Sequence, residues 1–197
     1  VKVPKSYVKI QDVINAANPG DTVSIGYGTY YEHVVINKTI SLVGENWQTT
    51  IIDGNGTGNT VEVTADSVTI IGFTIRNSGN QTNDSGIALN QVENCTIAGN
   101  NITANSSNGI WLYMSSNNNI TGNHIAENYD GIYLKNSADN TLAGNNITNN
   151  WDGIVAGFSS NNNITRNKIT ANNYYGIWFY SSSANSIYGN NITTDNK

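Results

Sequence analysis

The 197-residue sequence has little charge and almost no cysteine, methionine or proline. Charged residues make up 12% of the chain, and the formal net charge is −5. This acidic balance, without any basic cluster, argues against a nucleic-acid-binding protein. No apolar run approaches the length of a membrane-spanning helix, so we expect no transmembrane segment. The single cysteine, Cys95, excludes an internal disulfide bond.

Low charge alone is compatible with disorder, but the rest of the composition is not. The chain is rich in Ile, Val and Thr and contains 11 Tyr and 4 Trp, whereas disordered chains have few β-branched and aromatic residues. Asparagine occupies 36 positions. Because Asn favours turns and competes for backbone hydrogen bonds, the fold should have many turns and a structural use for the amide.

A short sequence repeat runs through the second half of the chain. The dipeptide Gly-Ile recurs at intervals of 23, 22, 22 and 23, starting at Gly86, Gly109, Gly131, Gly153 and Gly176. Two further series keep step, namely Asn100, Asn123, Asn145, Asn167 and Asn190, and Ile97, Ile120, Leu142, Ile164 and Ile187. Such self-similarity indicates stacked supersecondary units.

Within each repeat the apolar residues alternate with polar ones, as in Gly131-Ile-Tyr-Leu-Lys, which is typical of strands. Leucine-rich repeats have a similar period, but leucine is scarce here. We therefore predict an all-β fold, a right-handed single-stranded parallel β-helix. It would form one domain over residues 1–197 with about eight coils, regular over residues 86–197.

Stacked coils place equivalent residues roughly 4.8 Å apart, so identical side chains form ladders along the axis. Asn amides suit this arrangement because each one both donates and accepts. We predict three structural Asn ladders. They are Asn100, Asn123, Asn145, Asn167 and Asn190; Asn118, Asn140, Asn162 and Asn185, with Cys95 at the first position; and Asn105, Asn128, Asn150 and Asn172. Cys95 is then a small buried side chain and not a nucleophile.

The first half has less regular spacing. Its predicted strands are Thr22–Ile25, His33–Ile36, Thr39–Val43, Thr50–Ile52, Thr60–Val63 and Val68–Ile71. Before them, Ile10, Val13, Ile14 and Ala17 have helical spacing, and Asn18-Pro-Gly follows. We expect a short α-helix over residues 9–18 that caps the open end of the solenoid.

The two ends of the sequence differ in pattern. The last repeat, Ile187–Thr194, has no comparable cap, so we expect a chain cut from a longer protein or a second subunit over that end. Val1 is not a natural start, which favours a mature or excised segment.

Three N-terminal stretches share the frame of a known family. They are Ile10-Gln-Asp-Val-Ile-Asn-Ala-Ala-Asn-Pro-Gly-Asp-Thr-Val, Gly28-Thr-Tyr-Tyr-Glu-His-Val-Val-Ile and Lys38-Thr-Ile-Ser-Leu-Val-Gly-Glu. With the later Gly-Asn-x-Ile and Gly-Ile units, nearly the whole chain resembles the NosD-like family of carbohydrate-binding and sugar-hydrolysis β-helix repeats. Pectin methylesterases have a similar opening. The resemblance implies the fold, an extracytoplasmic location and an archaeal or bacterial surface protein, but function resides in sites.

The NosD-like resemblance raises the question of copper, which needs clusters of His, Cys or Met. His33, His124, Cys95 and Met114 lie in separate parts of the repeat. We therefore predict no metal site and no cofactor. We expect His124 to face solvent, because its position is variable and is occupied in other coils by Asn101, Asn146, Lys168 and Asn191.

Asp130 and Asp152 occupy the same repeat position in adjacent coils. Their carboxyl groups would lie roughly 5 Å apart, near the separation in retaining glycosidases, and repulsion would raise one pKa. The favoured alternative is that Asp before Gly is a turn residue, like Ser85 and Asn108 in earlier coils. Lys135 is the one cation nearby, and the catalytic sets of polygalacturonases and pectin methylesterases are not recognisable. The sequence therefore argues against an enzyme.

Aromatic residues gather at positions that strand alternation places on the outer surface. They are Trp111, Tyr133 and Trp178 after Gly-Ile; Tyr113 and Tyr180 two residues further on; and Tyr129, Trp151 and Tyr174 just before the Gly-Ile turn. Exposed aromatic patches mark binding surfaces. Three interpretations stay open: stacking on sugar rings, contact with a protein partner, and stabilisation of the sheet alone.

Eleven Asn-x-Ser/Thr sequons occur, and five of them are the recurring Asn-Ile-Thr. The glycosylation candidates are Asn37, Asn55, Asn101, Asn119, Asn146, Asn163 and Asn191. We hypothesise an extracellular or cell-surface structural protein that self-associates end to end or laterally, as in a filament or envelope. The alternatives are a carbohydrate-binding or polysaccharide-cleaving module that uses the aromatic stripe, and a periplasmic NosD-type metal-handling protein.

Overall fold

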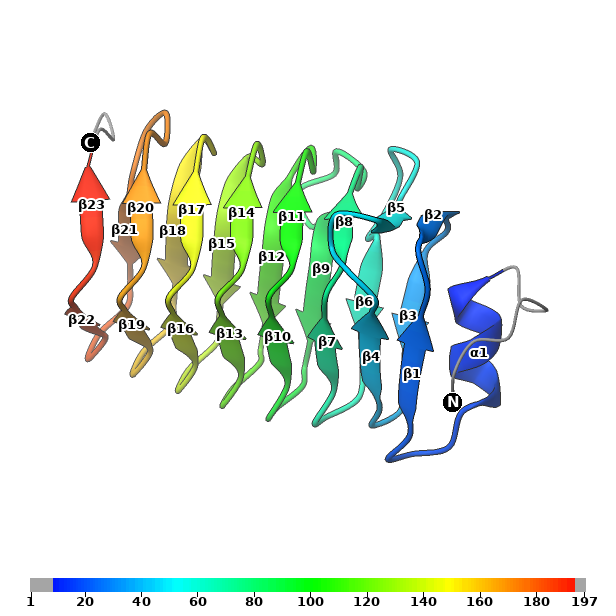
Figure 1. Cartoon of the computed structure of the whole chain (residues 1–197). Coiled ribbons are helices and arrows are strands. Elements are labelled where there is room, and N and C mark those ends of the chain that lie inside the picture. Colours follow the sequence, from blue (N-terminus) through cyan, green and yellow to red (C-terminus); the bar gives the residue numbers. More distant parts are fainter. Residues whose placement is uncertain (1–8, 194–197) are drawn as a thin grey trace.

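The computed structural model describes residues 9–193 and shows a parallel β-solenoid with one short helix at its N-terminal end (Figure 1). About seven turns of about 23 residues stack along one axis. The predicted fold class, an all-β solenoid with an N-terminal helix, is confirmed. Val1 and Thr194, on which the expectations about the two ends depend, lie outside the described residues.

Every turn contributes short strands to three parallel sheets. Within residues 9–193 the first sheet contains β1 (Thr22–Ile25), β4 (Ser41–Gly44), β7 (Thr69–Ile71), β10 (Thr96–Ala98), β13 (Asn119–Thr121), β16 (Thr141–Ala143), β19 (Asn163–Thr165) and β22 (Ser186–Tyr188). The second contains β2 (Gly28–Tyr31), β5 (Thr50–Asp53), β8 (Thr74–Arg76), β11 (Asn101–Thr103), β14 (His124–Ala126), β17 (Asn146–Thr148), β20 (Lys168–Thr170) and β23 (Asn191–Thr193). The third contains β3 (Val34–Ile36), β6 (Val61–Val63), β9 (Ser85–Asn90), β12 (Asn108–Tyr113), β15 (Asp130–Lys135), β18 (Asp152–Gly157) and β21 (Ile177–Tyr180).

The six strands predicted in the first half are all present, with ends shifted by two residues or fewer. Two strands of that half were missed, β2 and β8. The pattern of β2 lacks buried positions, since Gly28 to Tyr31 alternate between half-buried and exposed. The strand β8 is three residues long and contains one aliphatic side chain, Ile75.

The core consists of aliphatic ladders that follow the pairing register. Ile97 pairs with Ile120, and Ile120 with Leu142, which confirms the third repeating series. The Gly-Ile landmark also has a packing reason. A Cβ atom at Gly131 would lie 2.5 Å from the Gly153 carbonyl oxygen of the next coil, so only glycine allows adjacent coils to approach so closely.

Hydrogen bonds confirm the predicted Asn ladders. The Oδ1 atom of Asn123 accepts from the backbone N and the Nδ2 of Asn100, at 3.0 and 3.2 Å. In turn, the Nδ2 of Asn123 donates to Asn145 Oδ1 at 3.1 Å and to the Ile97 carbonyl at 2.8 Å. The other two ladders repeat this pattern. Each amide thus satisfies buried backbone groups of the preceding coil and bonds to the amide of the next coil.

The first position of the second ladder belongs to Cys95, as predicted. Its backbone N donates to Asn118 Oδ1 at 2.9 Å, and its thiol is buried. Burial raises the pKa of this thiol to about 11, which suits a packing role. A fourth ladder was missed in the sequence. It is made of the serine hydroxyls of Ser115, Ser137, Ser159 and Ser182.

The predicted cap helix is α1 (Ile10–Ala16), which lies across the first turn beside β1 (Figure 1). Its buried side chains are Ile10, Val13 and Ile14. The Glu32 carboxylate accepts from the backbone N of Ile10 at 2.7 Å and of Gln11 at 3.1 Å. A side chain from the first turn therefore caps the helix N-terminus, where free N–H groups favour an anion.

No helix within residues 9–193 is long and apolar enough to cross a membrane.

Candidate functional site

The third sheet and the turns that lead into it carry most of the predicted site residues. The pairing register aligns Trp111 with Tyr133, Tyr133 with Val155, and Val155 with Trp178 in four successive coils. Asn108, Asp130 and Asp152 are aligned in the same way at the starts of β12, β15 and β18. The structure therefore brings the acidic pair and the aromatic residues onto one outer face.

Tyr129, Trp151 and Tyr174 form a continuous stack along the solenoid axis, here called the aromatic row. The ring centroids lie 5.9 Å apart for Tyr129 and Trp151, and 6.0 Å apart for Trp151 and Tyr174. The rings are nearly parallel, with interplanar angles of 7° and 19°. Tyr129 is 54% exposed and Trp151 is 44% exposed, as the sequence predicted.

The third Asn ladder positions this row. Asn128 and Asn150 directly precede Tyr129 and Trp151, and their amides bond to one another inside the solenoid at 3.0 Å. The backbone N of Trp151 donates to the Asn128 carbonyl at 3.1 Å. Because both rungs are fixed, the two rings that follow them are held in register.

On the sheet itself, the expectation of solvent-facing aromatics was wrong for Trp111, which is only 9% exposed. Its ring lies flat against Tyr113 with 5.3 Å between centroids, so the pair covers its own strand. Tyr133 and Tyr180 are half-buried, and their hydroxyls bond at 2.6 Å. Tyr180 reaches Tyr133 by passing over Gly157, where a Cβ atom would collide with its ring.

Trp178 is 41% exposed and joins the sheet face to the aromatic row. Its ring stacks on Tyr175 at 5.5 Å, and Tyr175 contacts Tyr174 edge to face at 4.4 Å. Tyr175 was missed in the sequence. Its signal was the doublet Tyr174-Tyr175, because the interval from Gly153 to Gly176 exceeds the preceding one by a single residue, which adds a second ring.

Asp130 and Asp152 lie on this face at the first positions of β15 and β18, and are 9% and 5% exposed. They are strand residues and not turn residues, which corrects the favoured alternative. Burial, and then the charge of Asp152, raise the pKa of Asp130 to about 7. Burial also raises the pKa of Asp152, although a hydrogen bond from the Tyr175 backbone N at 2.8 Å opposes this. A catalytic role for the pair stays a prediction.

A pocket of about 340 Å³ opens beside Asp130. Its lining consists of Asn80, Thr82, Ser106, Ser107, Asn108, Tyr129, Asp130 and Tyr133. The Oδ1 atom of Asp130 is buried and has no hydrogen-bond partner. Asn80 and Thr82 come from the segment between β8 and β9, which the sequence analysis missed. The available signal was the longer spacing before Gly86, since Ile70 and its equivalent Ile97 are further apart along the chain than equivalent residues of the later coils.

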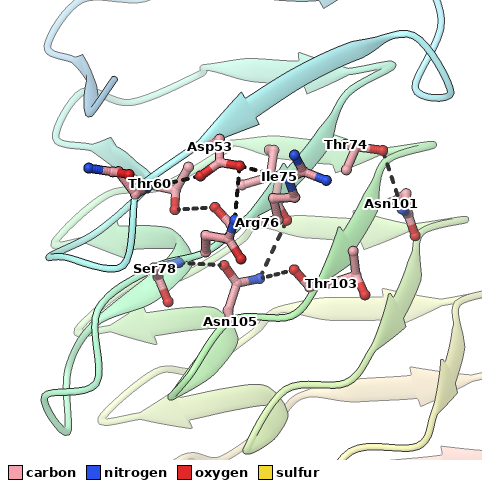
Figure 2. Close-up of polar contacts among 11 residues, drawn as sticks. Asp53, Thr60, Thr74, Ile75, Arg76, Ser78, Asn101, Thr103 and Asn105 are labelled. Carbon is pink, nitrogen blue, oxygen red and sulfur yellow. Dashed lines mark hydrogen bonds and ion pairs between the residues drawn. The ribbon is translucent and has the colours of Figure 1, made fainter. Parts of the chain in front are cut away.

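A third buried aspartate, Asp53, has the opposite environment to Asp130 (Figure 2). The Arg76 Nε and Asn77 Nδ2 atoms donate to its Oδ2 at 2.8 and 2.9 Å, and the Asn55 backbone N donates to its Oδ1 at 3.0 Å. Figure 2 shows Arg76 between Asp53 and the head of the third Asn ladder, where the Ser78 backbone N donates to Asn105. This aspartate is fully bonded, so its role is structural.

Among residues 9–193 no group of three or more His, Cys, Asp or Glu side chains is close enough to hold a metal ion. His124 is exposed and pairs in register with Asn101 and Asn146, as predicted. The His33 ring bonds to the Asn59 carbonyl at 2.7 Å and to the Thr57 hydroxyl at 3.1 Å.

The predicted glycosylation residues differ in exposure. The four exposed residues are Asn37, Asn55, Asn119 and Asn191. The three half-buried residues are Asn101, Asn146 and Asn163. Of the half-buried ones, Asn101 bonds to Thr74 and Asn146 to His124. Use of the sequons stays a prediction.

Comparison with known proteins identifies two kinds of similarity. Residues 59–197 match a protein family described as the right handed beta helix region. A cell surface glycoprotein of Methanothermus fervidus is 32% identical over 100 residues, which span 50% of this chain and 16% of that protein. The chain therefore matches about a sixth of the length of this curated relative.

Solved structures of similar shape include enzymes named for alginate and pectin. An alginate lyase from Paenibacillus sp. str. FPU-7 has a TM-score of 0.64 and 16% identity, covering 95% of this chain and 96% of that one. A periplasmic alginate epimerase has a TM-score of 0.66 and 18% identity over 93% and 52%. Pectin methylesterase from carrot has a TM-score of 0.60 and 15% identity over 92% and 79%. At these identities the likeness shows a shared fold.

Proposed function

The chain belongs to the right-handed β-helix family, and from this premise we propose that it is a cell-surface module that binds polysaccharide along the outer face of its third sheet. The aromatic row and Trp178 form the contact surface. Asp130 lines a pocket together with Tyr129 and supplies a polar group.

The observation that carries this proposal is the stack of Tyr129, Trp151 and Tyr174. Its first two rings are about half exposed, and the row follows the solenoid axis. Soluble proteins rarely leave contiguous aromatic surface in water without a binding role. Sugars have apolar C–H faces and polar hydroxyl edges, so they suit rings that are flanked by carboxyl and amide groups.

Location at the cell surface is supported by the similarity to the Methanothermus fervidus glycoprotein and by the sequon-rich repeat. The similarity of fold to an alginate lyase, an alginate epimerase and a pectin methylesterase is consistent with a polysaccharide ligand. Binding, and not cleavage, is the activity proposed, because Asp130 is the one carboxyl group in the pocket lining, whereas glycoside hydrolysis uses two.

A glycan array and a pull-down with insoluble polysaccharides test the proposal. We expect the wild-type chain to bind at least one polysaccharide and the double variant Trp151→Ala, Trp178→Ala to lose most of that binding. Trp47→Ala is the matched control, since Trp47 is equally exposed but lies in the turn between β4 and β5. Absence of binding by the wild type, or equal losses in the control, would contradict the proposal.

Self-association, which the sequence also predicted, stays a prediction. Sedimentation velocity over a range of protein concentrations checks it, and the double variant above tests whether the aromatic face takes part.

A further inference from the structure

The pocket beside Asp130 lies at the head of the aromatic row. Asn108 pairs with Asp130, so Ser107 is the equivalent of Tyr129 in the preceding coil. Trp151 covers one face of the Tyr129 ring. On the other side the equivalent position holds a serine, and among the described residues no second ring stacks on Tyr129. The pocket therefore lies where the row would continue by one more ring.

The pocket residues from the segment between β8 and β9 are fixed in place by hydrogen bonds. Asn80 and Thr82 belong to the long segment between β8 and β9. The Thr82 carbonyl accepts from Ser107 Oγ and from Asn108 Nδ2, both at 3.2 Å. The backbone N of Asn108 also donates to the Asp84 carbonyl at 3.1 Å. These bonds hold the segment against β12, so the pocket is largely preformed.

The pocket lining includes Asp130, which has an oxygen atom without a hydrogen-bond partner. Asp130 is about nine-tenths buried, and its Oδ1 atom has no partner. Buried polar atoms are nearly always hydrogen-bonded, and an exception calls for an explanation. The equivalent Asp152 does have a partner, the Tyr175 backbone N. The difference between these two residues leaves Asp130, which lines the pocket, with a hydrogen-bond acceptor that the protein does not use.

The lining also limits the charge of that ligand. It contains hydroxyl groups, side-chain amides, two tyrosines and one carboxyl, but no Lys, Arg or His. A carboxylate, sulfate or phosphate group would meet no counter-ion and would lie beside the carboxyl group of Asp130. A neutral ligand with several hydroxyls and a flat apolar face meets none of these penalties. The pocket volume lies at the small end of the range for ligand sites, about 300–1,000 Å³.

We propose that this pocket binds one neutral pyranose ring, which stacks on Tyr129 as the next member of the aromatic row and hydrogen-bonds through its hydroxyls to Asp130. The inference rests on the proposed function and names its ligand class and its subsite. The rest of the polysaccharide then follows the row toward Trp151 and Tyr174.

Three variants test the subsite. Tyr129→Ala removes the stacking surface. Ser107→Trp extends the row by one ring and fills the pocket, using a residue that the repeat already accepts at position 151. Trp47→Ala is the control, because it removes an exposed ring from the turn between β4 and β5, outside the aromatic row. Circular dichroism and melting temperature establish that each variant is folded.

Isothermal titration measures binding of the methyl glycosides of glucose, galactose and mannose, with galacturonate as the anionic probe, and of every polysaccharide retained by the wild type. We expect a neutral glycoside to bind more tightly than galacturonate. Tyr129→Ala should raise its Kd by about tenfold, Ser107→Trp should abolish binding, and Trp47→Ala should change the Kd of the neutral glycoside by less than about twofold.

The outcomes separate the subsite from the face. If the wild type binds a polysaccharide and loses it in the Trp151→Ala, Trp178→Ala variant, but Ser107→Trp and Tyr129→Ala bind like the wild type, the subsite is wrong and the proposed function stands. Tighter binding of galacturonate than of every neutral glycoside also overturns the subsite. Absence of any glycan binding by the wild type overturns both.

Discussion

Asp53 and Asp130 are both buried acids, but their surroundings shift their pKa values in opposite directions. Burial alone would raise the pKa of Asp53. The hydrogen bonds from Asn77, Asn55 and Arg76, with the charge of Arg76, outweigh it and hold the pKa below its usual value. Asp130 has no such partners, and burial together with Asp152 raises its pKa to about 7. A carboxyl left in this condition costs stability, which is typical of a site kept for function.

Replacing Asp130 by Asn should change how stability depends on pH. The folded-state pKa of Asp130 lies above the unfolded-state value, so the native protein keeps a proton that the unfolded chain releases between about pH 4 and pH 7. The free energy of unfolding therefore falls as pH rises through this window. Asp130→Asn removes that fall, since Asn is neutral and is already the residue at the equivalent position 108.

We expect Asp130→Asn to raise the melting temperature at pH 8 by more than at pH 4. Each unit of pKa shift corresponds to roughly 1.4 kcal/mol, so the gain at pH 8 should be a few kcal/mol at most. Thermal unfolding from pH 4 to pH 8 measures it, with the exposed Asp139→Asn as the control. Parallel pH profiles for wild type and Asp130→Asn would show that the carboxyl is ionised without penalty.

At the scale of the elements, the repeat predicted what depends on register. Once Gly131 and Gly153 are aligned, the Asn ladders, the Ile ladders and the exposed position of His124 follow. The corners could also be anticipated, because the residue before each rung has a positive φ, such as 63° at Gly122 and 65° at Gly144. This is why Gly-Asn recurs, and why Arg166 can take the same position only at some cost.

What the repeat could not predict depends on side chains that cross between coils. Tyr180 reaches Tyr133 two coils away because Gly157 leaves room for its ring. Trp111 is buried because it lies along its strand onto Tyr113 instead of standing out from the sheet. Strand alternation assigns a side chain to a face but does not determine its rotamer. The exposed fraction of each aromatic side chain on the outer face therefore could not be predicted from the sequence pattern.

Removing one rung from the middle of a ladder should destabilise the protein strongly. In Asn145→Ala the backbone N and the Nδ2 of Asn123 lose their acceptor, and the Ile120 carbonyl loses a donor at 2.8 Å. These groups are buried, so we expect a loss of about 2–4 kcal/mol in the free energy of unfolding. Denaturant titration measures it, and the exposed Asn119→Ala is the matched control. Equal effects of the two substitutions would mean that the ladder adds no stability.

The cap of α1 depends on one acidic side chain from another element. Glu32→Ala removes both acceptors at the helix N-terminus and should cost about 1–2 kcal/mol. Glu32→Gln retains one acceptor oxygen without the charge, so its free energy of unfolding should lie between those of the wild type and Glu32→Ala. Denaturant titration compares them with Glu62→Ala, a half-buried acid on β6. Should the Glu32 variants match Glu62→Ala, the helix would owe its position to apolar contacts alone.

For the whole molecule, the solenoid makes stability and function nearly one-dimensional. Each strand pairs only with the equivalent strands of the preceding and following turns. The stability of a turn therefore depends mainly on its contacts with its two neighbours. The proposed binding face follows the same axis, and an irregular segment between β8 and β9 closes the head of the row. The repeat pattern therefore could not predict the pocket, because part of its lining comes from a segment that interrupts the regular spacing.

This architecture predicts that damage to the cap spreads only a short distance. Ile14 is fully buried in α1, which packs against β1 and β3, so Ile14→Asp should release the helix from the first turn. Hydrogen exchange measured by mass spectrometry should then accelerate in α1, β1 and β3, less in β4 to β6, and not from β12 onward. The unchanged central coils serve as the internal control, because their own neighbours are intact. A uniform acceleration from β1 to β20 would instead mean that the solenoid opens as one cooperative unit.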